Sequence, residues 1–118
     1  MNQQITSEKK VWGNVQHVFC SEACAVSILE VQKGFRCSTH YHEHRINRFV
    51  VHSGVIDVIV YGKKHRLLPG SVFDVPPMEY HSFEVIESGT IVEVYWSPPV
   101  RLDDIVRSDS GGPIDPSS

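Results

Sequence analysis

Short alternating segments separated by turns are the feature of this sequence that most constrains its fold. Polar and apolar residues alternate in them with a period of two, which places the two kinds on opposite faces of a β-strand. No window of about eleven residues keeps the three-and-four spacing of an amphipathic helix. We therefore predict an all-β chain, with strands at residues 11–19, 25–32, 36–41, 47–52, 55–61, 72–75, 80–86 and 90–96.

Turn residues separate these predicted strands at regular intervals. Glycine, proline and short polar residues, which favour turns, form pairs at 33–34, 53–54, 69–70, 76–77 and 88–89. This spacing is typical of a β-sandwich or barrel. The segment 55–61 is apolar on both faces, which predicts a central strand.

Length and composition predict one domain. The chain has 118 residues, of which 41% are hydrophobic, and this supports a single modest core. We predict an N-terminal arm at residues 1–8, a β-domain at 9–107 and a flexible tail at 108–118. The tail is polar and rich in glycine, proline and serine, so burial cannot offset the entropy of ordering it.

Charged residues are mixed along the chain rather than clustered. There are 11 basic and 14 acidic residues, with a net charge of −3, so no basic face predicts a nucleic-acid or membrane partner. No apolar run approaches the ~20 residues of a membrane span, and residues 1–10 lack the apolar core of a secretion signal. We therefore expect a cytoplasmic protein.

The cysteines agree with a reducing compartment. Cys20, Cys24 and Cys37 are odd in number and lack the spacing of a disulfide framework. Zinc binding through these thiols is an alternative interpretation, although their spacing departs from the close pairs of most zinc sites. We interpret them as half-buried strand residues.

Three alternating histidines are the strongest chemical signal. His40, His42 and His44 project from one face of an extended strand, with neighbours about 7 Å apart along the backbone. Two imidazoles at this spacing can bend toward one ion at the ~2.0–2.1 Å that zinc requires. A solvated strand face or a satisfied core histidine is the structural alternative, because imidazole is also common in both places.

The residues around this pair resemble two linked motifs of the cupin superfamily. The matching residues are Gly34, His40, His42, Asn47 and Gly54 for the first motif, and Gly62, Pro69, Gly70, Pro76 and His81 for the second. The resemblance implies a double-stranded β-helix, or jelly-roll barrel. It also implies that His40 and His42 on one strand and His81 on another hold one divalent ion: zinc, nickel, iron or manganese.

Two positions of this pattern need separate treatment. Asn47 stands where the family usually has a ligand glutamate, and we keep it as a fourth candidate ligand. A neutral amide oxygen is a weaker donor than a carboxylate, so the site loses a negative charge. His44 has three open interpretations: a further ligand, a proton carrier, or a residue that faces solvent.

A closer resemblance extends over about residues 9–109. The segments 10–13, 50–54, 92–94 and 103–107, together with Arg45, are similar to the cupin domain of type II mannose-6-phosphate isomerases. That family interconverts an aldose phosphate and its ketose, which needs a base, a Lewis-acid metal and cationic groups for the phosphate. The Tyr-Gly-Arg that normally follows in the family is replaced here by residues 108–113.

This resemblance implies roles for four further residues. His44 and Arg45 are candidate catalytic residues, and Arg107 and Tyr80 are candidate substrate-binding residues. Arg45 and Arg107 are also candidate contacts for an anionic group. Surface arginines and an exterior strand tyrosine are the structural alternatives. Glu84 and Glu93 are also able to face the cavity, although the exterior of a strand is their more ordinary place.

Three functions remain open at this stage. A metal-binding cupin that binds a small ligand, such as a sugar phosphate, and isomerises it is the first. The second is an iron-dependent dioxygenase, because three histidines without a carboxylate resemble the ligand sets of some cupin dioxygenases. The third is a noncatalytic small-molecule or metal-binding module. We also expect a homodimer that exchanges residues 9–19 through edge strands.

Overall fold

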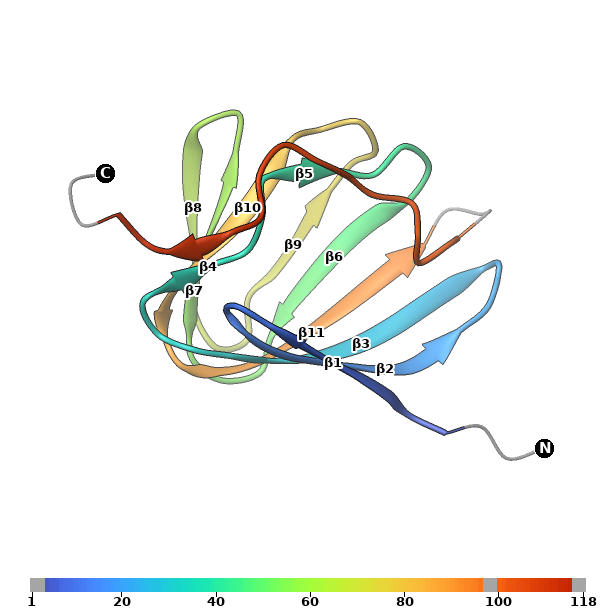
Figure 1. The fold of residues 1–118 in the computed structure, drawn as a ribbon, viewed down its shortest axis with the longest axis horizontal. Coiled ribbons are helices and arrows are strands. Elements are labelled where there is room, and N and C mark those ends of the chain that lie inside the picture. Colours follow the sequence, from blue (N-terminus) through green and yellow to red (C-terminus); the bar gives the residue numbers. More distant parts are fainter. Residues whose placement is uncertain (1–3, 97–99, 116–118) are drawn as a thin grey trace.

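The computed structural model of the chain describes residues 4–96 and 100–115. Thirteen strands and no helix occur among these residues, which confirms the all-β prediction. None of the described segments is therefore a helix that could cross a membrane. The strands form two antiparallel sheets that face one another (Figure 1).

The first sheet contains the long strands of the molecule. Its order is β1-β2-β3-β11-β6-β9, and all of its neighbouring strands are antiparallel. The strands are β1 (Thr6–Lys10), β2 (Gly13–Cys20), β3 (Cys24–Val31), β11 (Gly89–Trp96), β6 (Ile46–Val51) and β9 (Val72–Val75).

The second sheet combines short and long strands. Its main order is β12-β5-β10-β4-β13, with β7 paired to β10 and β8 paired to β7. The strands are β12 (Val106–Arg107), β5 (His40–Tyr41), β10 (His81–Glu87), β4 (Phe35–Arg36), β13 (Gly112–Pro113), β7 (Val55–Val60) and β8 (Lys63–Leu67).

Alternation explains which side chains enter the core. In β3, burial alternates along the strand, so that every second side chain points between the sheets. The first four residues of β7 are all buried, and β7 lies between β8 and β10, as predicted for a central strand. The main core consists of Trp12, Val15, Leu29, Val31, Cys37, Phe49, Val51, Ile56, Val58, Leu67, Val75, Phe83, Val85 and Ile91.

One glycine is required by close packing at the end of the barrel. Gly54, in the turn between β6 and β7, has a φ of +83°. A side chain there would place its first carbon 2.7 Å from the carbonyl oxygen of Glu87. Only glycine is free of both penalties, and this explains the 53–54 turn signal.

Two predicted strands are divided differently in the structure. The segment 36–41 is broken between β4 and β5: the amide of Cys37 still donates to the carbonyl of Phe83 in β10, whereas Thr39 is held by Ser108 and Asp109 of the C-terminal segment. The segment 11–19 begins with a turn at Val11 and Trp12, and residues on both sides of that turn pair as β1 and β2. The strand β8 was not predicted, since its residues are mainly charged and exposed.

The predicted domain boundaries also differ from what the structure describes. β1 begins at Thr6, inside the predicted arm. Residues 108–115 lie along the barrel, where β13 pairs with β4 and the amide of Ile114 donates to the carbonyl of Gly34 at 2.8 Å. Figure 1 shows this C-terminal segment, in red, passing β5 and then β4. Backbone hydrogen bonds join the described part of this segment to the barrel, and the mobility of the tail stays a prediction; residues 1–3 and 116–118 lie outside the described residues.

Candidate metal centre

Three histidines converge between the sheets. His40 is in β5, His42 follows the end of that strand, and His81 is the first residue of β10, directly opposite His40 in the ladder. Their ring centroids are 4.5 to 5.1 Å apart. One nitrogen of each ring lies within 4.8 Å of the corresponding nitrogens of the others. The structure thus brings together the three residues that the two sequence motifs pointed to.

Backbone carbonyls fix the orientation of each ring. The Nδ1 atom of His40 lies 2.7 Å from the carbonyl oxygen of Ser38, that of His42 2.7 Å from that of Asp104, and that of His81 2.9 Å from that of Glu79. A carbonyl oxygen only accepts, so each Nδ1 carries the proton and donates it. Each Nε2 therefore keeps its lone pair, as a metal ligand must.

The free nitrogens fit a metal ion. The Nε2 atoms of His42 and His81 are buried and have no hydrogen-bond partner within residues 4–96 and 100–115. A buried polar atom without a partner costs free energy, and a bound ion would satisfy both atoms. The three neutral imidazoles are buried and close together, and three imidazole nitrogens are suitable ligands for zinc, nickel or iron.

Burial also keeps the three rings neutral. Burial and the neighbouring histidines lower the pKa of His40 to about 2. Burial and the nearby Arg45 charge lower the pKa of His42 to about 3, while burial lowers that of His81 to about 4. No proton therefore competes with an ion for these nitrogens at neutral pH.

Asn47 lies close to this cluster on the opposite sheet. Its side chain is fully buried on β6, and neither amide atom has a hydrogen-bond partner among the described residues. The amide is near enough to His42 and Glu93 to affect their pKa values, but without hydrogen-bond geometry. Its position suits a weak fourth ligand, and its ligation stays a prediction.

A cavity of about 870 Å³ opens beside the histidines. Its lining combines apolar core residues with charged ones, among them His40, His42, Arg45, Glu93, Tyr95 and Arg107. Pockets of this size with a few convergent polar groups hold small molecules. The cavity is therefore the candidate ligand site.

A buried acid faces the histidines across this cavity. Tyr95 donates a hydrogen bond from its hydroxyl to Oε1 of Glu93 at 2.8 Å, and the guanidinium carbon of Arg45 lies 3.8 Å from the centre of the Tyr95 ring. Burial raises the pKa of both Glu93 and Tyr95. The more ordinary exterior interpretation of Glu93 is wrong. The phase of β11 was the available signal, since Ile91, Glu93 and Tyr95 share one face.

The other predicted site residues are placed unevenly. Arg107, in β12, pairs with His40 in the ladder and lines the cavity. His44 is exposed beyond the end of β5, with its Nε2 3.7 Å from the carboxylate of Glu43, because the strand and its alternation stop before it. Tyr80 is 40% exposed and packs on Tyr41 at 4.8 Å, away from the residues that line the cavity.

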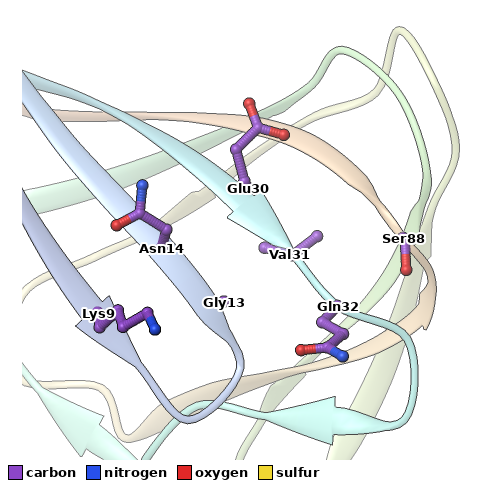
Figure 2. Close-up of a pocket in the computed structure, with 7 residues that line it drawn as sticks. All are labelled: Lys9, Gly13, Asn14, Glu30, Val31, Gln32 and Ser88. Carbon is purple, nitrogen blue, oxygen red and sulfur yellow. The ribbon is translucent and has the colours of Figure 1, made fainter.

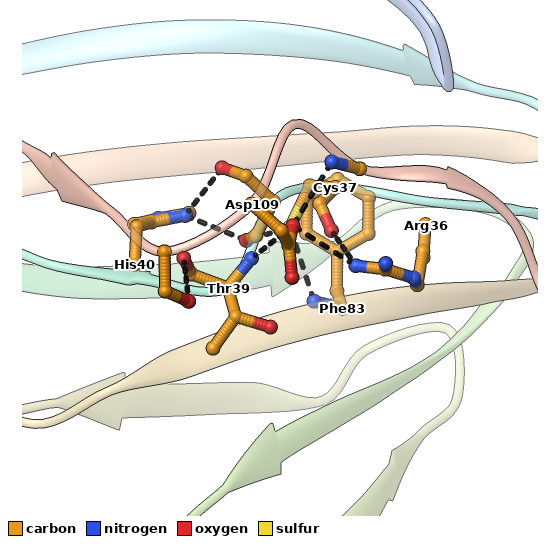
Figure 3. A network of polar contacts seen from close by, with 9 residues as sticks. Arg36, Cys37, Thr39, His40, Phe83 and Asp109 are labelled. Carbon is orange, nitrogen blue, oxygen red and sulfur yellow. Dashed lines mark hydrogen bonds and ion pairs between the residues drawn. The ribbon is translucent and has the colours of Figure 1, made fainter.

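The C-terminal segment holds the stretch that leads to His40. One carboxylate oxygen of Asp109 accepts from the amide of Thr39 at 3.0 Å and from Nη1 of Arg36 at 3.2 Å (Figure 3). The sulfur of Cys37 accepts from the amide of Phe83 at 3.1 Å, and burial raises the pKa of this thiol to about 12. Cys37 is thus a structural residue; it is buried between β4 and β5, rather than half-buried in a strand as predicted.

Asp104 performs the same task after the strand. Its carboxylate accepts from the amides of Glu43 and His44 at 2.8 and 3.0 Å, while its carbonyl fixes His42. Asp104 therefore holds both the turn after β5 and the imidazole ring of His42. Sequence reasoning missed this role because the two segments are 62 positions apart.

A second hollow lies on the first sheet (Figure 2). It has a volume of about 560 Å³, and its lining includes Lys9, Asn14, Glu30, Gln32 and Ser88. None of the histidines of the cluster reaches it. The cavity beside the histidines is therefore the better candidate for a reactive site.

Comparison with known proteins identifies the family. The model of the cupin domain matches residues 27–98, so the chain belongs to the cupin family. Within it, the fold is the double-stranded β-helix that the motifs predicted. No curated protein matches the chain.

Solved structures with the same fold include several enzymes. KdgF from Halomonas sp. has a TM-score of 0.73 at 20% identity, covering 86% of this chain and 90% of that chain. Oxalate decarboxylase from Bacillus subtilis has a TM-score of 0.76 at 15% identity, covering 88% of this chain and 30% of that chain. Pac13, a nucleoside dehydratase, has a TM-score of 0.76 at 12% identity, covering 90% and 86%. At these identities the likeness concerns the fold.

Proposed function

We propose that the chain is a metal-dependent enzyme that moves a proton on a small polar ligand in the barrel cavity. One observation carries this proposal. Two buried Nε2 atoms without partners, on His42 and His81, lie in a cluster that borders a cavity containing the buried pair of Glu93 and Tyr95. A metal site alone would not require a buried acid on the facing sheet.

His40, His42 and His81 would hold the divalent ion, with Asn47 as a weak fourth donor. The ion would supply Lewis-acid polarisation of a ligand oxygen. Zinc, nickel, iron and manganese are the candidates, and elemental analysis of the purified protein distinguishes them. Lewis-acid chemistry is common to all four, so the proposal does not depend on which one is present.

Glu93 is the residue that would take and return the proton. Its carboxyl group is buried, its pKa is raised, and it lines the same cavity as His40 and His42. A carboxyl group with a raised pKa exchanges protons closer to neutral pH than an exposed one does. The Tyr95 hydroxyl holds one carboxylate oxygen and so orients the other toward the ligand.

Sugar phosphates are the first substrates to test, because the resemblance to type II mannose-6-phosphate isomerases implies them. Metal-loaded protein is mixed with mannose 6-phosphate, other hexose and pentose phosphates, and hexuronates, and products are followed by NMR. We expect turnover of at least one compound, lost in H42A and reduced in E93Q with its metal content intact. Absence of turnover across the panel by fully metal-loaded protein contradicts the proposal.

A second candidate function is the use of oxygen by bound iron. It is favoured by a ligand cluster that contains three histidines and no carboxylate among the described residues. Anaerobic loading with Fe²⁺, followed by oxygen-uptake measurement with the same compounds, tests it. Uptake tied to product formation supports oxygenase chemistry, whereas product without uptake supports proton transfer.

We also propose that two copies pair through β1. This strand is the outer strand of the first sheet, and most of its residues are exposed. An open edge of this kind is a template for another strand. Light scattering of the wild-type chain and of a Ser7→Pro variant tests it, and we expect a dimer that the proline weakens.

A further inference from the structure

Arg45, Arg48 and Arg66 differ in what binds the edge of the guanidinium group that carries Nε. Arg48 donates from Nε and Nη2 to the two oxygens of Asp74 at 2.8 and 3.0 Å. Arg66 uses the same two nitrogens on Asp57, at 2.9 and 3.1 Å. This paired geometry is the one in which a guanidinium recognises a carboxylate. Both arginines therefore have the Nε edge occupied by an acid.

Arg45 presents the same edge without an acid. Its Nη1 donates to the carbonyl oxygen of Arg101 at 2.6 Å, and its Nε is buried with no hydrogen-bond partner within residues 4–96 and 100–115. The residue is 3% exposed, and it forms no ion pair with any described carboxylate. A buried cation that makes no ion pair is costly, because burial removes much of its hydration.

The nearest buried acid does not fill this position. Glu93 binds the Tyr95 hydroxyl at 2.8 Å and makes no ion pair with Arg45. Both residues line the cavity, so Arg45 and the acid border one space. A ligand that enters this space lies beside Arg45, whose Nε has no hydrogen-bond partner among the described residues.

Arg45 is also close to the histidine cluster. Its guanidinium packs on the Tyr95 ring at 3.8 Å, and that ring lies 5.7 Å from the ring of His42. The positive charge of Arg45 is near enough to lower the pKa of both His42 and His81. A ligand of a few carbon atoms therefore spans the distance from Arg45 to an ion on the histidines.

We propose that Arg45 binds a carboxylate of the ligand, and that the cavity accepts small organic acids. This inference rests on the proposed metal-dependent function and narrows its substrate class to compounds such as sugar acids. One carboxylate carries a single negative charge, which a single buried guanidinium compensates. A carboxylate is also planar, so it can lie in the plane of the guanidinium while one face of that guanidinium packs on the Tyr95 ring.

Calorimetric titration of zinc-loaded protein tests the inference. The probes are succinate, its neutral analogue succinamide, and inorganic phosphate, and the zinc content is measured before and after each titration. For the wild type we expect succinate to bind at least about tenfold more tightly than succinamide or phosphate. This part of the experiment needs no variant.

Variants assign the effect to Arg45. We expect R45Q to weaken succinate binding at least about tenfold and R45K to recover part of it, because lysine keeps the charge but not the two parallel donors. R48Q is the matched control, since Arg48 already binds Asp74 on the outside of the barrel. It should leave succinate affinity unchanged.

Several results would overturn the inference. Equal affinity of the wild type for succinate and succinamide would do so, as would tighter binding of phosphate than of succinate. Retention of succinate affinity in folded, zinc-loaded R45Q would also exclude it. A wild-type protein that binds no metal contradicts the proposed function instead, and succinate titration of that metal-free protein still tests Arg45.

Discussion

The two sheets that enclose the cavity satisfy their polar groups in different ways. On or next to the second sheet, the inward nitrogens of His42 and His81 have no hydrogen-bond partner among the described residues, whereas the Nδ1 atoms of all three histidines are held by backbone carbonyls. On or next to the first sheet, Asn47 and Arg45 keep side-chain atoms with no partner of any kind among the described residues. The histidine side is built for an ion, whereas the facing side has polar groups that a ligand would satisfy.

The largest expected effect is the loss of metal binding when one of the three histidine ligands is removed. His42→Ala should abolish stoichiometric metal binding, because two imidazoles cannot replace a three-histidine set. Folding should persist, since the main core is formed by other residues. Elemental analysis measures the metal, and circular dichroism the fold.

His44→Ala is the matched control for this variant, because His44 is exposed outside the cluster. It should retain full metal content. Loss of metal from His44→Ala would show that the turn, rather than the three buried rings, determines binding.

A pH series measures how strongly the histidine side is desolvated. The pKa values of the three rings fall from 6.5 to between about 2 and about 4 on folding. The unfolded chain therefore binds more protons below pH 6.5, and the stability of the metal-free protein falls as the pH decreases from about 7 to 4. Each ring contributes up to about 1.4 kcal/mol per pH unit in that window.

Urea unfolding at pH 7.5, 6 and 5 provides the measurement. Saturating zinc should add a similar increment of stability at pH 7.5, 6 and 5, because the folded rings stay largely unprotonated over this range. A flat stability profile over this range would contradict the buried, neutral state of the rings.

A variant of Asp104 tests whether the residues that orient His42 affect metal affinity. Asp104→Ala removes the carboxylate that holds the amides of Glu43 and His44, so the carbonyl contact to His42 becomes less well ordered. We expect metal affinity to fall about tenfold or more, as for other residues that orient metal ligands. Competition with a chromophoric chelator measures it. Asp103→Ala, at an exposed ion pair with Arg101, should change affinity less than about twofold.

The smallest effect is expected on the facing side. Tyr95→Phe removes the hydroxyl that binds Glu93, which should lower the free energy of unfolding by about 1 kcal/mol while metal affinity stays unchanged. Tyr80→Phe is the control, since Tyr80 packs on Tyr41 outside the cavity. A loss of metal in Tyr95→Phe would mean that the two sides act as one unit.

Sequence reasoning predicted the strands that alternate. Strands β3, β6 and β11 overlap the predicted ones closely, because one of their faces is buried and the other is not. It missed β8, whose residues Lys63, Lys64 and Arg66 are exposed, so burial leaves little pattern in its sequence. It also gave residues 108–115 no structure, because their order depends on partners such as Arg36 and Thr39 far away in the chain.

The candidate site was predictable to the extent that it follows motif spacing. His40 and His42 are marked by alternation, but His81 was found through the resemblance to cupins alone. His44 continues the same alternation in the sequence, and the structure separates it because β5 ends at Tyr41. The empty edge of Arg45 cannot be seen in any sequence pattern, since it depends on which acids pair with the other arginines.

The carbonyl of Asp104 has a consequence for the order of events in the cell. All three histidines leave the ribosome before this carbonyl does, because it lies 62 positions after the ring that it orients. A nascent chain that stops before residue 100 carries the imidazoles without the group that fixes one of them. We therefore expect the ion to be held in its final geometry only after the segment that contains Asp104 has emerged and packed against His42.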